Sequence, residues 1–400
     1  MQLSVRRWIS ITNVSTLLKF LQGFLNEVLT SVSMKRLRWC PSSREELDNA
    51  ERKIFSYMKK KYQSRYVEVG WIGDSSSPCR LWTVTMDPSE PPQGAESPLP
   101  LVLLHGLGCG SALWVMNLEA LSRRRVVHCI DLLGFGRSSR PALGDDAWLI
   151  EQQMVNSIEM WRQKMGLERF VLVGHSLGGF LSASYSLQYP SHVAHLVLED
   201  PWGFPVFDPS RQRPSKKLPF WAPPIQHFLN HTNAFWGVRA IGHLGPIVLG
   251  KAISEADVYF GHFVKEKGAI PNYAYHCNVR RPTGEEAFRK LCVFFGWTKN
   301  PMMHRFLQLS PEVPVTFLYG DKSFITRSPA VFIKKQREST AYVELKVLKD
   351  CGHNVHMEKP EEYNAIVVKV CDMADAERKK EIIAENHEVA QTEVTVMRQL

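Results

Sequence analysis

Residues 171–179 read Val-Leu-Val-Gly-His-Ser-Leu-Gly-Gly, and they decide what kind of fold this chain adopts. An apolar run at 170–173 fits a buried strand, a G-x-S-x-G turn follows, and residues 180–188 suit a helix. The glycines on either side of Ser176 lack a Cβ, so a strand and a helix can pack closely around a sharp turn that leaves the serine at its apex. A G-x-S-x-G pattern alone could be an ordinary loop. With a strand before it and a helix after it, the pattern predicts a nucleophile elbow.

Segments typical of strands and helices alternate on both sides of this turn. The sequence predicts further strands and two helices, the strands at 66–71, 80–86, 101–104, 126–130, 193–198, 313–319 and 342–347 and the helices at 41–61 and 151–165. Strands separated by helices indicate an α/β fold with a mostly parallel, doubly wound sheet. In such sheets the chemistry lies at the carboxyl ends of the strands.

The length of 400 residues exceeds the roughly 250–300 that a single core usually holds, so we expect additional parts. From 201 to 301 the alternation stops and the segment is rich in Pro, Trp, Phe and His. This composition predicts an inserted helical lid over an apolar substrate, although an ordinary helical cap with its own small core would have a similar composition. We therefore divide the chain into an N-terminal segment, a core in two parts around the lid, and a charged tail that is an exposed helix or partly disordered, with bounds 1–40, 41–200, 201–301, 302–372 and 373–400.

The net charge of +9 is concentrated at the N-terminus, because residues 1–40 contain six lysines and arginines against one glutamate. The sequence contains no helix-turn-helix, RNP or zinc-finger pattern, so we expect no nucleic-acid partner, and an anionic lipid surface fits the charge better. The eight cysteines are scattered without a C-x-x-C pair, which indicates reduced cytosolic thiols. We expect no metal and no cofactor, and no run of about 20 apolar residues predicts a spanning helix.

Residues 14–29 place apolar side chains at helical spacing, so that one face of the helix is apolar. Basic residues flank this segment on both sides, which favours a helix lying in a membrane interface. A targeting segment and an ordinary helix packed on the body are the alternatives. We therefore expect a cytoplasmic protein that associates peripherally with a lipid droplet or an intracellular membrane.

A serine becomes a good nucleophile only when a base takes its proton and an acid orients the base. In this architecture the partners follow in the order serine, acid, histidine, so His353, after the last strand, is the predicted base. For the acid we favour Asp321, after the strand at 313–319. Asp200, at the end of the strand after the elbow, is the alternative, and the absence of any functional acid is the third option.

Hydrolysis also requires two backbone N–H groups aimed at the developing oxyanion. The residue after the nucleophile, Leu177, supplies one of them. The turn His105-Gly106-Leu107-Gly108 supplies the other, and we assign it to Leu107.

Several motifs resemble the α/β-hydrolase-domain 4/5 subfamily over residues 39–372, namely His105-Gly106-Leu107-Gly108, the run from Asp131 to Pro141, Gly178-Gly179-Phe180-Leu181, Tyr185-Ser186-Leu187, Pro201-Trp202-Gly203-Phe204-Pro205 and Tyr275-His276-Cys277-Asn278. The resemblance implies the α/β-hydrolase fold with an inserted lid. It also implies one of two functions. One kind of member carries asparagine at the nucleophile position and activates a triglyceride lipase on lipid droplets. The other keeps serine and resembles a lysophospholipase acting on N-acyl phosphatidylethanolamines.

Two positions depart from the pattern of the subfamily. Thr326 stands where the family has its aspartate, and Glu358 stands where the family has the aspartate of a His-x4-Asp motif linked to lysophosphatidate acyltransferase activity. Because Ser176 is present, we predict a serine hydrolase that cleaves acyl esters of (lyso)phospholipids, with N-acyl phosphatidylethanolamine as a candidate, at a membrane or droplet surface. The alternatives are a non-catalytic co-activator, whose partners would be a triglyceride lipase or a droplet coat protein, and, less favoured, a lysophosphatidate acyltransferase.

Overall fold

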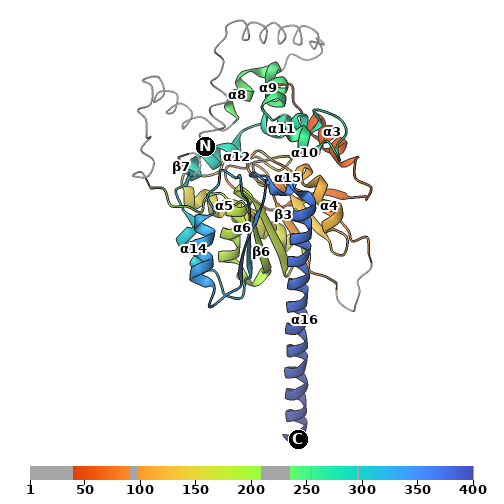
Figure 1. The fold of residues 1–400 in the computed structure, drawn as a ribbon, viewed down its shortest axis with the longest axis vertical. Helices are drawn as coiled ribbons and strands as arrows, with labels where there is room; N and C mark the ends of the chain where they lie inside the picture. The colour runs from red at the N-terminus through yellow and green to blue at the C-terminus, as the bar shows by residue number, and fades with distance from the viewer. Residues whose placement is uncertain (1–38, 91–96, 209–234, 254, 295–296, 400) are drawn as a thin grey trace.

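The computed structural model describes residues 39–90, 97–208, 235–253, 255–294 and 297–399 (Figure 1). The predicted helix at 14–29 therefore lies outside the described residues. At the centre is an eight-stranded sheet of order β1-β2-β4-β3-β5-β6-β9-β10. Its strands are β1 (Gln63–Glu68), β2 (Arg80–Met86), β3 (Leu101–Leu104), β4 (Val127–Ile130), β5 (Phe170–His175), β6 (Val193–Glu199), β9 (Val315–Gly320) and β10 (Val343–Leu348).

The six strands from β4 to β10 run parallel, and only β1 and β2 are antiparallel to their neighbours. The prediction of an α/β fold with a mostly parallel, doubly wound sheet is therefore confirmed. The strand at 101–104 has the predicted bounds, whereas the first strand lies three residues earlier than predicted. The helix predicted at 41–61 is shorter, because α3 (Arg44–Phe55) ends at Ser56 and a turn then leads into β1.

Helices cover both faces of the sheet, because successive strand residues point to opposite sides. Leu104 and Leu172 belong to a core with α5 (Ala147–Met165), α6 (Leu177–Gln188) and α14 (Ser328–Arg337). Leu103 and Val173 belong to a second core with α3, α4 (Val115–Leu121) and the first turns of α16 (Pro360–Gln399). Short 3-10 turns connect several elements, namely η1 (Ser111–Trp114), η2 (Pro190–His192), η4 (Gly242–Leu244) and η5 (Phe306–Gln308).

Between β6 and β9 the chain leaves the sheet and forms a helical layer over the carboxyl ends of the strands (Figure 1). This layer contains α8 (Trp236–Ala240), α9 (Gly245–Ala252), α10 (Glu255–Phe260), α11 (Ala269–Asn278), α12 (Thr283–Leu291), and the hairpin of β7 (Cys292–Phe294) and β8 (Trp297–Thr298). The short α13 (Met302–Arg305) leads back to the sheet, and α15 (Val355–Glu358) precedes α16.

The C-terminal residues continue the last helix of the core. Apolar residues at helical spacing, Tyr363, Val367, Val370 and Ala374, bury one face of α16. Beyond them α16 extends away from the body to the C-terminus (Figure 1). The division predicted at residue 373 therefore falls within one helix. None of the described helices combines the length and hydropathy needed to cross a membrane.

Candidate active site

Ser176 occupies the sharp turn between the end of β5 and the start of α6. Its φ of 53° is unusual for a residue other than glycine and places backbone strain at this position. A Cβ on Gly174 would lie 2.4 Å from the carbonyl oxygen of Gly178, and a Cβ on Gly178 would lie 2.4 Å from that of Leu104. Both flanking glycines are therefore required sterically. Ser176 is 9% exposed, and its hydroxyl makes no hydrogen bond with the described part of the chain.

The His353 imidazole contacts a carboxylate from the neighbouring strand. His353 Nδ1 lies 2.5 Å from Oδ2 of Asp200, the first residue after β6. The Asp200 side chain is 0% exposed, and the hydroxyl of Ser323 donates a second hydrogen bond to the same oxygen. Burial raises the pKa of Asp200, although the hydrogen bonds from His353 and Ser323 oppose this effect. Because Asp200 accepts at Nδ1, that nitrogen carries a proton and Nε2 of a neutral ring is left free to act as a base.

Asp321, the acid favoured from the sequence, lies elsewhere and does not contact His353. Its Oδ1 accepts a hydrogen bond from the backbone N–H of Cys351 at 3.1 Å, and its side chain is exposed. This N–H is the main cause of the lowered pKa of Asp321. Asp321 thus stabilises the loop that follows β10. The alternative acid, Asp200, is the carboxylate that contacts the imidazole of His353.

His175 connects the serine turn directly to the loop that carries His353. Its Nε2 lies 3.1 Å from the carbonyl oxygen of His353, and the centroids of the two rings are 4.8 Å apart. Burial lowers the pKa of His175 to about 3, so this ring is neutral. Since a carbonyl only accepts, Nε2 of His175 carries the proton. His175, the residue before the candidate nucleophile Ser176, therefore holds the loop of the candidate base close to it.

The turn at 105–108 packs against Ser176 from the other side. A Cβ on Gly106 would lie 3.0 Å from Cβ of Ser176, so only glycine allows this approach. His105 fixes the turn, because its Nδ1 donates to the Gly106 carbonyl at 2.7 Å and its Nε2 accepts from the N–H of Leu132 at 3.0 Å. From the helical layer between β6 and β9, the ring of Phe235 packs on Gly108.

The two predicted oxyanion donors are both available. Leu107 follows Gly106 in this turn, and Leu177 is the first residue of α6. Within the described residues, neither backbone N–H donates a hydrogen bond to a protein acceptor. Helix N-terminal N–H groups have no partner within the helix, so the one at Leu177 is free to bind a ligand oxygen.

A second acid–histidine pair, which the sequence motifs did not predict, lies beside the first. Oε1 of Glu199, the residue before Asp200, accepts from the backbone N–H of His356 at 2.9 Å and lies 2.7 Å from its Nδ1. Burial alone would raise the pKa of Glu199, but the imidazoles of His356 and His175 lower it overall. The signal in the sequence is two adjacent acids at the end of one strand together with histidines at 353 and 356.

Among the described residues, Glu199, His356 and His175 could together hold a metal ion, because each offers one possible ligand atom and these atoms lie within 4.8 Å of one another. Glu199 Oε1 and His356 Nδ1 are already hydrogen-bonded to each other. The arrangement is therefore that of a buried support for the loop that carries His353.

Glu358 secures the same loop from the other end. Its two carboxylate oxygens accept from the backbone N–H groups of Gly352, at 2.7 Å, and Asn354, at 3.2 Å. These two residues flank His353 in the sequence. Glu358 therefore positions the backbone of His353, a role that its location in the sequence did not indicate.

Curated relatives match most of the length of this chain. Residues 100–360 match the alpha/beta hydrolase fold family. The (lyso)-N-acylphosphatidylethanolamine lipase of Homo sapiens is 38% identical over 84% of this chain and 94% of its own length. The 1-acylglycerol-3-phosphate O-acyltransferase ABHD5 of Sus scrofa is 37% identical over 84% of this chain and 92% of its own.

Solved structures support the same fold. Carboxylesterase CesB from Bacillus subtilis superposes with a TM-score of 0.54 at 16% identity, covering 81% of this chain and 96% of that one. At this identity the likeness shows the fold alone. The relatives and the family match confirm the resemblance found in the sequence motifs, and the chain belongs to the α/β hydrolase fold family, in the group of the (lyso)-N-acylphosphatidylethanolamine lipases and ABHD5.

Proposed function

We propose that this protein is a serine hydrolase that cleaves acyl esters of (lyso)phospholipids, with N-acyl phosphatidylethanolamine and its lyso form as the first candidates. Ser176 is the nucleophile, His353 the base and Asp200 the acid. The observation that carries the proposal is the 2.5 Å contact between His353 Nδ1 and the buried Asp200 carboxylate, next to a serine held at a strained turn.

The reaction follows from these positions. Oγ of Ser176 attacks the ester carbonyl while Nε2 of His353 takes its proton, and the oxyanion accepts hydrogen bonds from the N–H groups of Leu107 and Leu177. When the intermediate collapses, the C–O bond of the ester breaks and the leaving alcohol takes the proton from Nε2. Water, deprotonated by His353, then hydrolyses the acyl-serine. Asp200 stabilises the imidazolium that forms in both halves.

The substrate class rests on the relatives and on the charge pattern. The curated relatives named as lipases act on (lyso)-N-acylphosphatidylethanolamine, and they match this chain over 94% of their length. The basic segment at 1–40, with its apolar helical face, suits attachment to an anionic lipid surface. We therefore include in the proposal a cytoplasmic, peripheral location on a lipid droplet or an intracellular membrane.

The test compares Ser176→Ala with the wild-type chain and with Ser191→Ala, an exposed serine in η2 that serves as the matched control. We expect the wild-type and Ser191→Ala proteins to react with a fluorophosphonate probe and to release fatty acid from lyso-N-acyl phosphatidylethanolamine. Ser176→Ala should do neither. Folded wild-type protein that neither reacts with the probe nor releases fatty acid from any lysophospholipid would refute the enzyme proposal.

Two other functions predict different results in the same assays. A co-activator would stimulate a triglyceride lipase equally well with Ser176→Ala, and loss of residues 1–30 would abolish the stimulation. The ABHD5 relatives are named as 1-acylglycerol-3-phosphate O-acyltransferases. An enzyme of that kind would transfer acyl groups from acyl-CoA to lysophosphatidate. Glu358 is engaged with the backbone on both sides of His353, which gives it a positioning role that hydrolysis also needs.

A further inference from the structure

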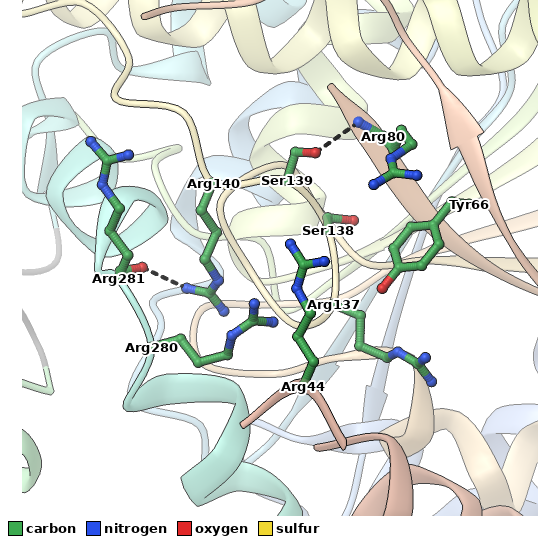
Figure 2. A pocket seen from close by; sticks show the side chains of 9 residues that line it. All are labelled: Arg44, Tyr66, Arg80, Arg137, Ser138, Ser139, Arg140, Arg280 and Arg281. Atoms are coloured by element: carbon green, nitrogen blue, oxygen red, sulfur yellow. Dashed lines mark hydrogen bonds between the residues drawn. The ribbon is translucent and has the colours of Figure 1, made fainter. Parts of the chain in front are cut away.

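A cavity of about 290 Å³ lies between the sheet, α3 and the lid, and most of its lining is arginine (Figure 2). It contains none of the residues of the candidate active site. Its volume is near the lower end of the roughly 300–1,000 Å³ of ligand pockets. The lining side chains are those of Arg44, Tyr66, Arg80, Arg137, Ser138, Ser139, Arg140, Arg280 and Arg281.

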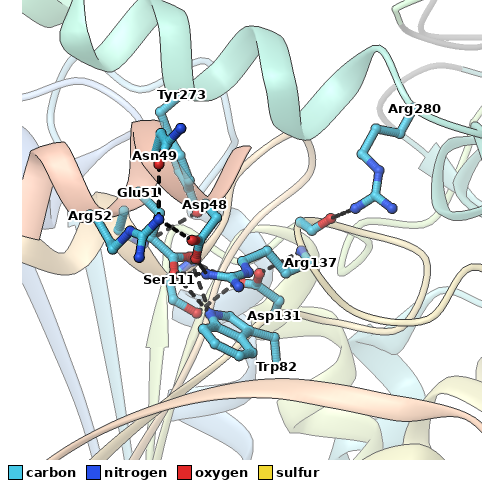
Figure 3. Close-up of polar contacts among 12 residues, drawn as sticks. Asp48, Asn49, Glu51, Arg52, Trp82, Ser111, Asp131, Arg137, Tyr273 and Arg280 are labelled. Carbon is cyan, nitrogen blue, oxygen red and sulfur yellow. Dashed lines mark hydrogen bonds and ion pairs between the residues drawn. The ribbon is translucent and has the colours of Figure 1, made fainter. Parts of the chain in front are cut away.

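Only two of the six arginines have carboxylate partners in the described residues. Arg137 pairs with Asp48 at 2.5 Å and with Glu51 at 2.8 Å, and its guanidinium lies 3.6 Å from the centre of the Trp82 ring (Figure 3). Arg281 lies 3.5 Å from Asp74. The other four, Arg44, Arg80, Arg140 and Arg280, form no ion pair with the described part of the chain. The lining therefore carries a large excess of positive charge.

Backbone carbonyls fix the guanidinium of Arg140 but leave one of its N–H donors without an acceptor. Its Nη1 and Nη2 donate to three backbone carbonyls, those of Arg281, Gly136 and Cys277, while its buried Nε has no acceptor. Burial, and then the charge of Arg280, lowers the pKa of Arg140 to about 10. Burial and the charge of Arg44 also lower the pKa of Arg280. These like charges repel one another, and the attraction of each guanidinium to an anion bound between them would offset that repulsion.

Phosphate is the anion that such a lining recognises best. The planar guanidinium offers its N–H groups in a fork that matches phosphate oxygens two at a time. Arg280 makes one long hydrogen bond, 3.4 Å to the carbonyl of Gly136, and Arg44 makes none with described residues, so both can turn toward a ligand. The hydroxyl of Ser139 accepts from the N–H of Arg80 at 2.9 Å and keeps its own proton for donation.

The cavity lies on the same edge of the sheet as Ser176 but on different strands. Arg80 begins β2, which is separated from β5 by β4 and β3. At about 4.8 Å per strand spacing, β2 lies roughly 14 Å and β4, which leads to Arg137 and Arg140, roughly 10 Å across the sheet from β5. The cavity is therefore offset from the serine along this edge of the sheet.

We propose that Arg44, Arg80, Arg140 and Arg280 form a binding pocket for a phosphate ester, separate from the candidate active site. A phospholipid head group is the source that the position favours. Arg44 is the first residue of α3, and only three residues of sequence separate it from the basic segment at 1–40 that is predicted to contact lipid. A soluble phosphate ester would offer the same chemistry.

The experiment uses the full-length chain with Ser176→Ala, so that no ester is cleaved and the outcome does not depend on the proposed hydrolysis. Arg44→Gln/Arg280→Gln removes two pocket charges, and Arg123→Gln/Lys379→Gln removes two exposed charges elsewhere. Calorimetry measures binding of glycerol 3-phosphate. Flotation with phosphatidylcholine vesicles, with and without phosphatidic acid, measures recruitment to lipid. Thermal melts establish that both variants are folded.

We expect the protein to bind glycerol 3-phosphate saturably. The affinity of the pocket variant should be lower by about a hundredfold or more, because each charge-assisted contact contributes roughly tenfold or more. The control should lose little. Recruitment to phosphatidic acid that depends on the pocket and is competed by glycerol 3-phosphate identifies a lipid head group as the source. If both variants are recruited equally to the vesicles and only the pocket variant loses binding of glycerol 3-phosphate, the natural ligand is a soluble phosphate ester. The proposal is overturned if neither ligand binds through the pocket, or if the control loses as much as the pocket variant.

Discussion

Exchange of Asp200 for asparagine tests which carboxylate orients His353. The side chain keeps its shape but loses the negative charge that lies 2.5 Å from Nδ1. Because Asp200 is 0% exposed, water has little access to replace the lost acceptor. An amide at this position also favours the wrong tautomer of the imidazole. In a serine triad this change lowers kcat by about 10⁴-fold, and we expect a fall of that order here with little change in KM.

The matched variant is Asp321→Asn, which alters the acid first favoured from the sequence. Asp321 is exposed and accepts one hydrogen bond, from the N–H of Cys351. An asparagine can still accept that bond, so kcat should stay within about threefold of the wild-type value.

Both variants are assayed for release of fatty acid from lyso-N-acyl phosphatidylethanolamine, with active sites counted by fluorophosphonate labelling and folding followed by thermal melts. The assignment would fail if Asp321→Asn lost activity by orders of magnitude while folded Asp200→Asn kept at least a tenth of it. Equal and small effects of both changes would indicate that no carboxylate orients His353.

Three further outcomes follow from single contacts. Gly106→Ala places a methyl group 2.8 Å from Nδ1 of His175 and 3.0 Å from Cβ of Ser176, so kcat should fall about a hundredfold and the free energy of unfolding by about 1–3 kcal/mol; a full-rate variant would contradict the tight approach. Glu358→Gln leaves a single acceptor oxygen for the two N–H groups beside His353, so unfolding free energy should fall by about 1–2 kcal/mol and kcat should fall with it, as chemical denaturation and kinetics would show. Burial alone would raise the pKa of Glu159, but hydrogen bonds from Arg162, Tyr185 and Gln163 lower it to about 2. The folded state is therefore stabilised above pH 4.5, and this stabilisation is lost as the pH falls toward 2. Urea melts from pH 5 to pH 2 should show a steeper loss for the wild type than for Glu159→Gln.

The strands and the serine turn were predictable because local patterns determine them. The apolar run at 170–173 fits a buried strand. Gly174 is required by its close approach to the backbone of Gly178, and Gly178 by its approach to Leu104 at the end of the neighbouring strand β3. The position of His353 followed from its place after the last strand. The helix of the tail was harder to predict, because α16 continues past its last buried apolar residue, Ala374, with only polar contacts to the body, such as the ion pair of Glu381 with Arg169.

The acid was not predictable because spacing along the chain does not determine which carboxylate reaches the imidazole. β6 and β9 are neighbours in the sheet, so Asp200 and Asp321 both follow strands that end at the same edge. Their backbones differ, since Asp200 has a φ of 43°, a conformation that its residue type alone does not predict. The N–H of Asp321 donates to the carbonyl of Leu348 at 2.9 Å, which keeps this residue beside the end of β10.

The strain at Ser176 and that at Asp200 belong to one arrangement. The N–H of Ser176 donates to the carbonyl of Glu199 at 3.0 Å, and the N–H of Trp202 donates to the carbonyl of Ser176 at 3.1 Å. The serine backbone is thus bonded on both sides to the chain around Asp200. Neighbouring hydrogen bonds can hold residues in unfavourable backbone conformations, and such strain is concentrated where geometry matters for chemistry. Because Glu199 and Asp200 then hold His356 and His353, the end of one strand fixes the proposed nucleophile, the proposed base and the loop that carries it.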